Sequence, residues 1–400
     1  MKSITFATLL AASFALFLSA WPCRADGPDD NLPEKVRPVP PEGVVIPEET
    51  AKTLRAGLAE LEAAIAVLGR QKEHADRIVA YLPDVEIFHK AVHDALEYHE
   101  FFDPKEFAVA EDLLRQGKAR AEQLKTGETP WTRLTGAVVR AYRSRIDGSV
   151  QPYGVEIPEG HDFGQTNPSR LDFWFHGRGE KLSELSFLQQ RSSGRGSKIK
   201  PAGSIVLHPY GRYSNANKFA GEMDLFEALE NARRDYGIDD DRIFVRGFSM
   251  GGAACWQFTV HFAGLWAGAQ PGAGFSETPD FLKTFQGETL SPTWWEEKLW
   301  RWYDATNWAI NLSNVPTIAY SGEIDRQKQA ADMMVAATQK VGLNLVHLIG
   351  PQTAHALHPD SLAEIERRLG SIADRGRERS PRTVRFVTHT LRYDQMHWVR

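Results

Sequence analysis

Strand-like and helix-like patterns alternate along more than half of this 400-residue chain, and this alternation restricts the possible folds most strongly. Short apolar runs with the length of buried strands lie at residues 171–175, 204–208, 242–245, 315–320 and 343–349. Stretches with helical spacing lie between and after them, at residues 223–236, from 253 onward, 327–341 and 359–372. The alternation predicts a largely parallel sheet with helices on both faces.

The sequence before this region predicts a small helical unit at residues 47–133. Leucine and isoleucine recur at intervals of three and four between residues 54 and 68, which is the spacing of one helix face. Residues 84–99 predict a second helix, and Asp103-Pro104 supplies an N-cap and a first-turn proline for a third. The α/β domain is then expected at residues 134–376. It opens with strands at 138–146 and 150–157, which flank the hairpin turn Asp147-Gly148.

The end of the chain returns to a strand pattern. Residues 383–388 alternate apolar and polar side chains, and residues 396–400 are again strand-like. We expect a short β segment at residues 377–400, either a hairpin or the start of a further β domain.

The first 25 residues predict a secretory signal peptide. Lys2 is followed by an apolar run at residues 4–18 and by small residues near Cys23-Arg24-Ala25. The alternative is an uncleaved membrane anchor, but the run is shorter than the ~20 residues of a membrane span. Residues 26–46 are rich in Pro, Asp and Glu and predict a flexible leader. We therefore expect a secreted or periplasmic protein without stable membrane association.

Composition excludes several classes of function. The net charge is -5 and no block of Lys and Arg is present, so nucleic-acid binding is not expected. No clustered spacing of metal ligands occurs, and we expect neither a metal nor an organic cofactor. Of the two cysteines, Cys23 lies in the predicted signal peptide, so a mature chain holds one thiol. Cys255 is expected to be a core residue.

The clearest chemical motif is G-x-S-x-G at Gly247–Gly251, with Ser249 at its centre. It follows a predicted strand and precedes a predicted helix, which is the context that a nucleophile elbow requires. Glycines at both flanks allow a sharp, strained turn that projects the Ser hydroxyl from the carboxyl end of the sheet. The motif predicts Ser249 as a nucleophile; the alternative is a glycine-rich turn with a capping serine.

An acid and a base follow at the ends of the next strands. Asp325 comes just after residues 315–320 and is the preferred acid, with Glu323 as its rival. His355 lies in the loop after residues 343–349 and is the preferred base. His358 is the alternative, but Pro359 places it at the start of a helix. A triad of this kind transfers the serine proton to the histidine, which the aspartate orients.

An oxyanion hole is expected from two loops. The backbone N–H of Met250, directly after the nucleophile, is the first donor. His176-Gly177-Arg178-Gly179 follows the strand at 171–175, and Gly177 or Arg178 would supply the second. The alternative is an ordinary glycine turn, and His176 is expected to be structural.

Five tryptophans gather between the nucleophile helix and the strand before Asp325, which predicts a lid at about residues 276–312. Its aromatic side chains could line a substrate pocket or form the core of a helical insertion. The candidate pocket residues are Trp294, Trp295, Trp300 and, at another strand end, Tyr210.

These segments resemble the catalytic domain of the prolyl oligopeptidase family, and secreted feruloyl and acetylxylan esterases, over about residues 136–375. The resemblance implies an α/β-hydrolase fold and a serine hydrolase that cleaves a peptide or ester bond of a small-molecule substrate through an acyl-enzyme. The helical unit differs from the propeller of prolyl oligopeptidase, which puts strict oligopeptide specificity in doubt. The alternative function is a catalytically silent carbohydrate- or protein-binding module of the same fold.

Overall fold

The computed structural model describes residues 38–193 and 198–400, so the predicted signal peptide lies outside the described residues. Eight strands form one sheet in the order β1-β2-β4-β3-β5-β6-β7-β8. β2 runs antiparallel to β1 and β4, and all other neighbours are parallel, as the alternating pattern predicts. The strands are β1 (Gly136–Arg143), β2 (Val150–Ile157), β3 (Ser169–Phe175), β4 (Ile205–Pro209), β5 (Ile238–Phe248), β6 (Gly268–Gly272), β7 (Ile318–Gly322) and β8 (Val346–Gly350).

Helices cover both faces of the sheet because its strands carry large apolar side chains on both sides. On β3, the ring of Phe175 lies 5.1 Å from that of Phe258 in α7, whereas Trp174 joins the cluster formed with Ile365 and Leu369 of α11. Every residue of α7 is buried. The helices of this domain are α5 (Glu184–Ser192), α6 (Ala220–Asp235), α7 (Met250–His261), α8 (Pro279–Phe281), α9 (Trp294–Trp300), α10 (Lys328–Lys340) and α11 (Pro359–Arg375).

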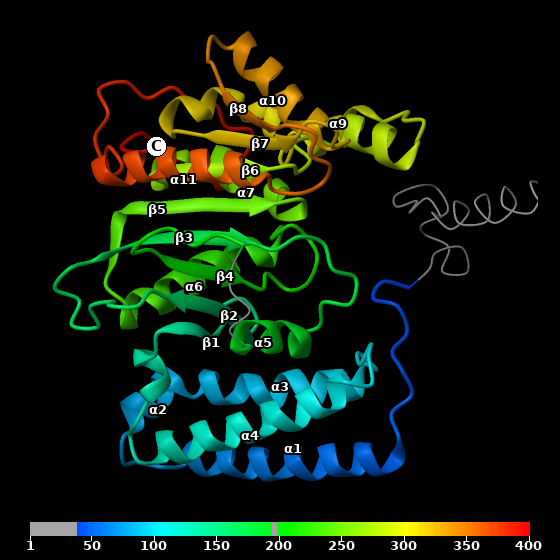
Figure 1. Cartoon of the computed structure of the whole chain (residues 1–400), viewed down its shortest axis with the longest axis vertical. Helices are drawn as coiled ribbons and strands as arrows, with labels where there is room; N and C mark the ends of the chain where they lie inside the picture. The colour runs from blue at the N-terminus through cyan, green and yellow to red at the C-terminus, as the bar shows by residue number, and fades with distance from the viewer. Residues whose placement is uncertain (1–37, 194–197) are drawn as a thin grey trace, which may run out of the picture.

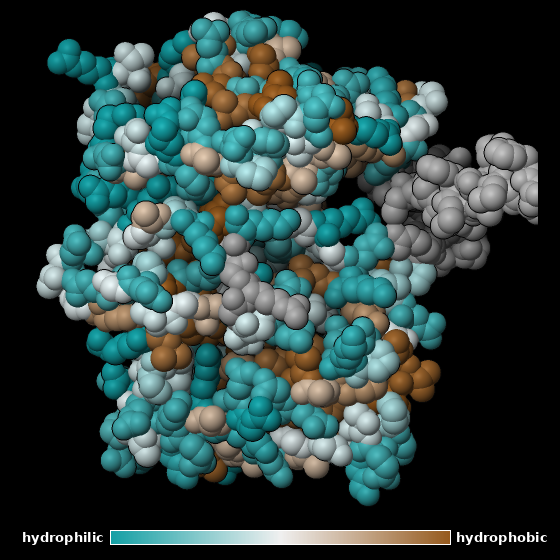
Figure 2. Space-filling model, viewed as in Figure 1, coloured by the Kyte–Doolittle hydropathy of each residue, from teal (hydrophilic) through white to brown (hydrophobic). Residues whose placement is uncertain are grey.

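The N-terminal helices lie together at the β1 end of the sheet (Figure 1). They are α1 (Glu48–Leu68), α2 (Ala75–Tyr81), α3 (Pro83–Glu97) and α4 (Glu106–Lys125). The repeated leucines of α1, Leu54, Leu58 and Leu61, are buried, as their spacing predicts. Hydrophilic residues cover most of this unit in Figure 2, since its apolar side chains point inward.

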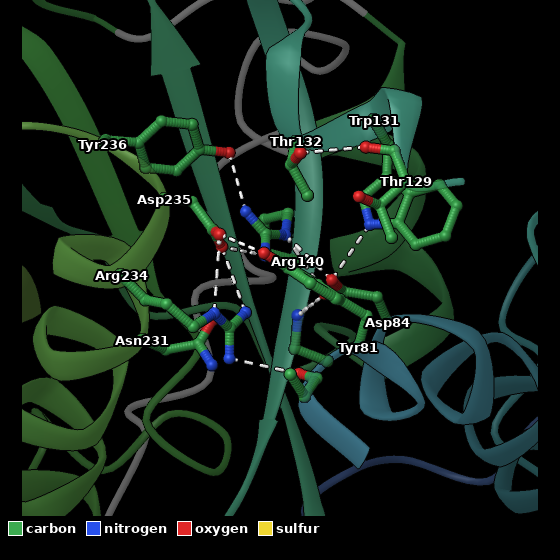
Figure 3. A network of polar contacts seen from close by, with 12 residues as sticks. Tyr81, Asp84, Thr129, Trp131, Thr132, Arg140, Asn231, Arg234, Asp235 and Tyr236 are labelled. Carbon is green, nitrogen blue, oxygen red and sulfur yellow. Dashed lines mark hydrogen bonds and ion pairs between the residues drawn. The ribbon is translucent and has the colours of Figure 1, made fainter. Parts of the chain in front are cut away.

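A buried ionic network joins the helical unit to the sheet (Figure 3). Arg140 of β1 places Nε 3.0 Å from Asp84 Oδ2 of α3, and Nη2 2.6 Å from Asp235 Oδ2 at the end of α6. Asp84 also accepts hydrogen bonds from Trp131 Nε1 at 2.9 Å and from the Ala141 N–H at 2.6 Å. Arg140 and Asp84 are fully buried, so each depends on the other for charge compensation.

The β segment that the sequence predicts at residues 377–400 is not formed. The only regular element there is the 3₁₀ turn η6 (Leu391–Tyr393), and a single bridge joins Met396 to Val399. The extended backbone finds side-chain partners in place of a strand: the Val387 N–H donates to Asn311 Oδ1 at 2.8 Å. The strand prediction was wrong because alternating apolar and polar residues fit any extended segment with one buried face, whether or not it pairs in a sheet.

Elements without a counterpart in the expected pattern include β6, α5 and, in the helical unit, α2. β6 is Gly-Ala-Gln-Pro-Gly, which lacks β-branched residues, yet it forms an interior strand of the sheet between β5 and β7. α5 is short and amphipathic only in part. None of the helices in the described ranges combines the length and the apolar character of a membrane span.

Candidate active site

The candidate catalytic residues lie at the carboxyl ends of parallel strands. Ser249 follows β5, Asp325 follows β7 and His355 follows β8. Gly177, a candidate oxyanion-hole residue, follows β3. Because β3, β5, β6, β7 and β8 are mutually parallel, all four loops emerge from the same edge of the sheet.

Ser249 has the strained backbone of a nucleophile elbow. Its φ of 61° and ψ of -126° are unusual for a residue with a side chain. Small neighbours make the turn possible, since a Cβ on Gly251 would lie 2.1 Å from the Phe175 carbonyl oxygen. A Cβ on Gly247 would lie 2.2 Å from the Gly251 carbonyl oxygen. The Ser249 N–H donates to the Gly272 carbonyl at 2.9 Å, which fixes the turn to β6.

His355 and Asp325 form a hydrogen-bonded pair, with 2.7 Å between His355 Nδ1 and Asp325 Oδ2. The Asp325 side chain is only 3% exposed, whereas that of His355 is 40% exposed. The second carboxylate oxygen, Oδ1, accepts from the Gln327 N–H at 2.8 Å. A buried carboxylate on Nδ1 leaves Nε2 of the imidazole for proton transfer.

The imidazole of His355 lies beside the nucleophile strand. Its ring centroid is 4.8 Å from that of Phe248, the residue before Ser249. Backbone hydrogen bonds join the acid and base loops: the Glu323 N–H donates to Gly350 at 2.9 Å and the Ile324 N–H to Thr353 at 3.0 Å.

Glu323 and His358, the alternative acid and base, form hydrogen bonds with other residues. Glu323 Oε2 accepts from the backbone N–H and the side chain of Gln352, at 2.7 and 2.9 Å, and so braces the base loop. His358 is the N-cap residue of α11, and its N–H donates to the Tyr320 hydroxyl at 2.8 Å. The geometry therefore pairs His355 with Asp325 and leaves both rivals in loop-supporting positions.

The proposed oxyanion loop lies against the elbow. A Cβ on Gly177 would be 3.7 Å from Ser249 Cβ, and Met250 is the first residue of α7. The first N–H groups of a helix have no partner within the helix, so this position favours an anionic oxygen. His176 holds the loop, with Nδ1 2.9 Å from the Gly177 oxygen and Nε2 2.9 Å from the Tyr210 oxygen. The Arg178 guanidinium is exposed and pairs with Glu180.

The tryptophans of the predicted lid do not form one cluster. Trp294 and Trp295 are 65% and 51% exposed on α9, which has no buried residue, and Trp300 is half-buried. Trp308, in contrast, is fully buried in η5 (Ala305–Asn314). Tyr210 is buried, donates its hydroxyl to the Leu182 carbonyl at 3.1 Å, and lines a cavity that contains none of the candidate catalytic residues.

A buried charge cluster beneath the elbow was missed by sequence reasoning. Arg246, two residues before Phe248, contacts Asp172 of β3 at 3.2 Å and Glu366 of α11 at 2.5 Å. Burial disfavours its charge, but these carboxylates outweigh burial and raise the pKa of Arg246. Asp172, inside the apolar run at 171–175, and Arg246, directly after the run at 242–245, are the charged residues that could have indicated it.

The cysteine outside the predicted signal peptide lies in the core. Cys255 is fully buried, donates its thiol to the Val245 carbonyl, and burial raises its pKa to about 12, as expected of a core cysteine. Among residues 38–193 and 198–400, no three His, Cys, Asp or Glu side chains gather as a metal site.

Comparison with known proteins gives one family match. A model of the prolyl oligopeptidase family matches residues 211–370, a range that includes Ser249, Asp325 and His355. No curated protein matches the chain.

Several solved structures are similar in fold. They include the fluorophosphonate-binding serine hydrolase F of Staphylococcus aureus, with 18% identity over 60% of this chain and 99% of that chain, at a TM-score of 0.45. A ferulic acid esterase has 12% identity over 60% and 97%, at 0.43. A puromycin-hydrolyzing peptidase of Mycobacterium tuberculosis has 16% identity over 62% and 40%, at 0.42. The chain is therefore similar to the prolyl oligopeptidase family over residues 211–370, and its mostly parallel sheet is that of an α/β fold.

Proposed function

We propose that this protein cleaves an ester or peptide bond through a covalent acyl-enzyme at Ser249. His355 takes the proton from the serine hydroxyl as the oxygen attacks the carbonyl carbon, and returns it to the leaving group. Water then attacks the acyl-enzyme, with His355 again as base. The observation that carries the proposal is the 2.7 Å contact between His355 and buried Asp325, at the edge where Ser249 adopts a strained elbow.

The oxyanion is assigned to two backbone donors. The N–H of Met250 at the start of α7 would be one, and that of Gly177 or Arg178 the other. The closeness of Gly177 to Ser249 supports this assignment. Backbone donors of this kind need no rearrangement during the reaction, which is why they lower the barrier effectively.

A labelled probe and a pair of substrates test the proposal. Wild-type protein should react with a fluorophosphonate probe and hydrolyse p-nitrophenyl acetate or a prolyl-p-nitroanilide, whereas Ser249→Ala should do neither. Ester turnover alone would identify an esterase, and anilide turnover a peptidase. A folded wild-type protein with neither labelling nor turnover would contradict the proposal and favour the silent binding module.

Export is a second part of the proposal. It is supported by the basic start, apolar run and small residues within residues 1–25. Cell fractionation with N-terminal sequencing of the recovered protein tests it. A mature N-terminus near residue 26 in the periplasm or medium is expected, and an intact Met1 in the cytoplasm would contradict it.

A further inference from the structure

Two neighbouring loops leave the same edge of the sheet, one after β3 and one after β4, because these two strands are parallel neighbours. The first is the proposed oxyanion loop, residues 176–179, in which a Cβ on Gly177 would lie 3.7 Å from Ser249 Cβ. The second connects β4 to α6 and comprises residues 210–219; we call it the β4–α6 loop. Gly177 therefore brings the first loop next to the proposed nucleophile.

The oxyanion loop has little to restrain its own backbone. Two of its four residues are glycine, which adopts both left-handed and right-handed backbone conformations. Gly177 and Arg178 are exposed, so burial does not hold them in place. An oxyanion hole is effective only when its N–H groups already point at the position of the oxyanion. The restraint on these N–H groups must therefore come from residues outside the loop.

Ser214 of the β4–α6 loop supplies such a restraint through its hydroxyl group. The Oγ atom accepts a hydrogen bond from the Gly179 N–H at 3.0 Å and donates one to the Gly179 carbonyl oxygen at 3.0 Å. The N–H belongs to the peptide group between Arg178 and Gly179, and the carbonyl belongs to the next peptide group. One hydroxyl thus orients two successive peptide groups beside the proposed donors.

Two further contacts join the loops on either side of Gly177 and Arg178. The Tyr213 hydroxyl donates to the Glu180 carbonyl oxygen at 2.7 Å. At the start of the oxyanion loop, Nε2 of His176 lies 2.9 Å from the Tyr210 carbonyl oxygen. The β4–α6 loop therefore contacts the oxyanion loop both before and after the two residues that would supply the second oxyanion donor.

The β4–α6 loop itself has an unusual backbone that is held by ion pairs. Five of its non-glycine residues have a positive φ, among them Arg212 at 59° and Tyr213 at 85°. Such angles are uncommon for residues with a side chain and persist only where the surroundings enforce them. Here Asp224 Oδ2 and Asp147 Oδ2 lie 3.0 and 2.5 Å from nitrogens of the Arg212 guanidinium. The residue pair before Ser214 is thus fixed independently of the oxyanion loop.

We propose that Ser214 is a positioning residue for the oxyanion hole. Its hydroxyl holds the backbone of the oxyanion loop so that the N–H of Gly177 or Arg178 points at the carbonyl oxygen of the substrate attacked by Ser249. The inference rests on the proposed hydrolase function and adds a residue that acts only through the backbone of another loop. Because the oxyanion forms in the transition state, loss of this restraint lowers kcat and leaves KM nearly unchanged.

Two substitutions at Ser214 test the inference, with the better of the ester and anilide substrates. Ser214→Ala removes both hydrogen bonds to Gly179, so kcat should fall by about 10- to 100-fold, somewhat less than for the loss of a donor itself. KM should stay within about twofold of the wild-type value. Ser214→Thr keeps a hydroxyl and should hold kcat within about threefold of wild type. Ser371→Ala, which removes an exposed hydroxyl bonded to the Arg367 carbonyl in α11, should leave kcat unchanged.

Tyr213→Phe is the second variant, since it keeps the ring and removes only the hydroxyl that bonds to Glu180. Its kcat should fall several-fold with KM unchanged, and it decides the matter if urea unfolding shows that Ser214→Ala does not fold. A folded Ser214→Ala with wild-type kcat, a loss that Ser214→Thr does not restore, or a change in KM alone would overturn the inference and leave the hydrolase proposal intact. Absence of Ser249-dependent turnover in the wild type would instead overturn both.

Discussion

His355 and Asp325 are 30 residues apart in the chain, yet their side chains meet at 2.7 Å. The register of two neighbouring strands explains this contact. Gly322 at the end of β7 pairs with Gly350 at the end of β8. A Cβ on Gly322 would lie 2.3 Å from the Thr353 carbonyl oxygen, so glycine allows the two loops to touch. Backbone packing thus positions the proposed acid and base before any substrate binds.

This contact predicts a large effect for Asp325→Asn. The amide cannot hold the imidazole in the required tautomer, so kcat should fall by about 10⁴-fold. Glu323→Gln is the matched control: it is two residues away and supports the Gln352 loop, so kcat should change by less than about tenfold. Steady-state hydrolysis of the best ester or anilide measures both. Equal losses in the two variants would contradict the assignment of Asp325.

Alanine substitutions at the two histidines of this loop should also differ strongly in their effect on activity. His355→Ala removes the group paired with Asp325, and activity should fall by at least about 10³-fold. His358 is tied to α11 through its backbone N–H, which an alanine keeps. His358→Ala should therefore keep its activity within about tenfold of wild type. An inactive but folded His358→Ala, with His355→Ala still active, would reverse the two roles.

Much of the fold and of the candidate site follows from local patterns in the sequence. The strand before Ser249, the helix after it, and the loops after β7 and β8 are each visible in short stretches, because an elbow needs glycine and parallel strands end at one edge. The C-terminal tail was mispredicted for the opposite reason. Its partner is the side chain of Asn311, which lies 76 residues earlier in the chain.

Long-range electrostatic contacts also cannot be predicted from local patterns in the sequence. Arg246 interacts with Glu366, 120 residues later, and no spacing rule connects the two. The cavity lined by Ala91, Glu184 and Tyr210 has walls from α3, α5 and the loop after β4, so it depends on how the helical unit packs against the sheet domain. Such features depend on how elements pack, whereas the position of the proposed triad residues depends on where single strands end.

Alanine substitutions at Gly251 in the elbow and at Gly370 in α11 should have opposite effects on the stability of the fold. Gly251→Ala would place a methyl group 2.1 Å from the Phe175 carbonyl oxygen, so it should abolish probe labelling and destabilise the fold by at least ~1–3 kcal/mol. Gly370 lies inside α11 with open space around its missing Cβ, and Gly370→Ala should stabilise by up to ~1 kcal/mol. Urea unfolding and labelling measure both. A labelled, stable Gly251→Ala would contradict the elbow.

The network of Figure 3 predicts that Asp84→Asn is strongly destabilising. The variant leaves Arg140 buried with reduced charge compensation, which costs about 3–5 kcal/mol. Glu364→Gln removes an exposed pairing with Arg367 and should give no measurable change, since water screens such pairs. Urea unfolding at neutral pH compares the two. A similar midpoint for both variants would show that the network is not needed for docking of the helical unit.

Asp304 predicts a pH dependence of stability. It is 6% exposed, accepts from Thr278 Oγ1 at 2.7 Å, and lies near the carboxylate of Glu277. Burial, reinforced by Glu277, raises its pKa to about 7, whereas Lys218 opposes the shift. The folded state therefore binds the Asp304 proton more tightly than the unfolded state, whose Asp pKa is about 3.9. The stability contributed by this group is complete below pH ~4 and is lost as pH rises through 7.

Asp304→Asn isolates this contribution, because the amide oxygen can still accept from Thr278 and carries no titrating proton. Wild-type protein should lose more unfolding free energy than the variant between pH 4 and 8, by at most on the order of 4 kcal/mol. The difference between the two proteins should stop growing above the folded-state pKa of about 7. Urea unfolding at half-unit steps of pH measures it. Parallel stability curves would mean that Asp304 stays ionised in the fold, with Lys218 compensating its charge.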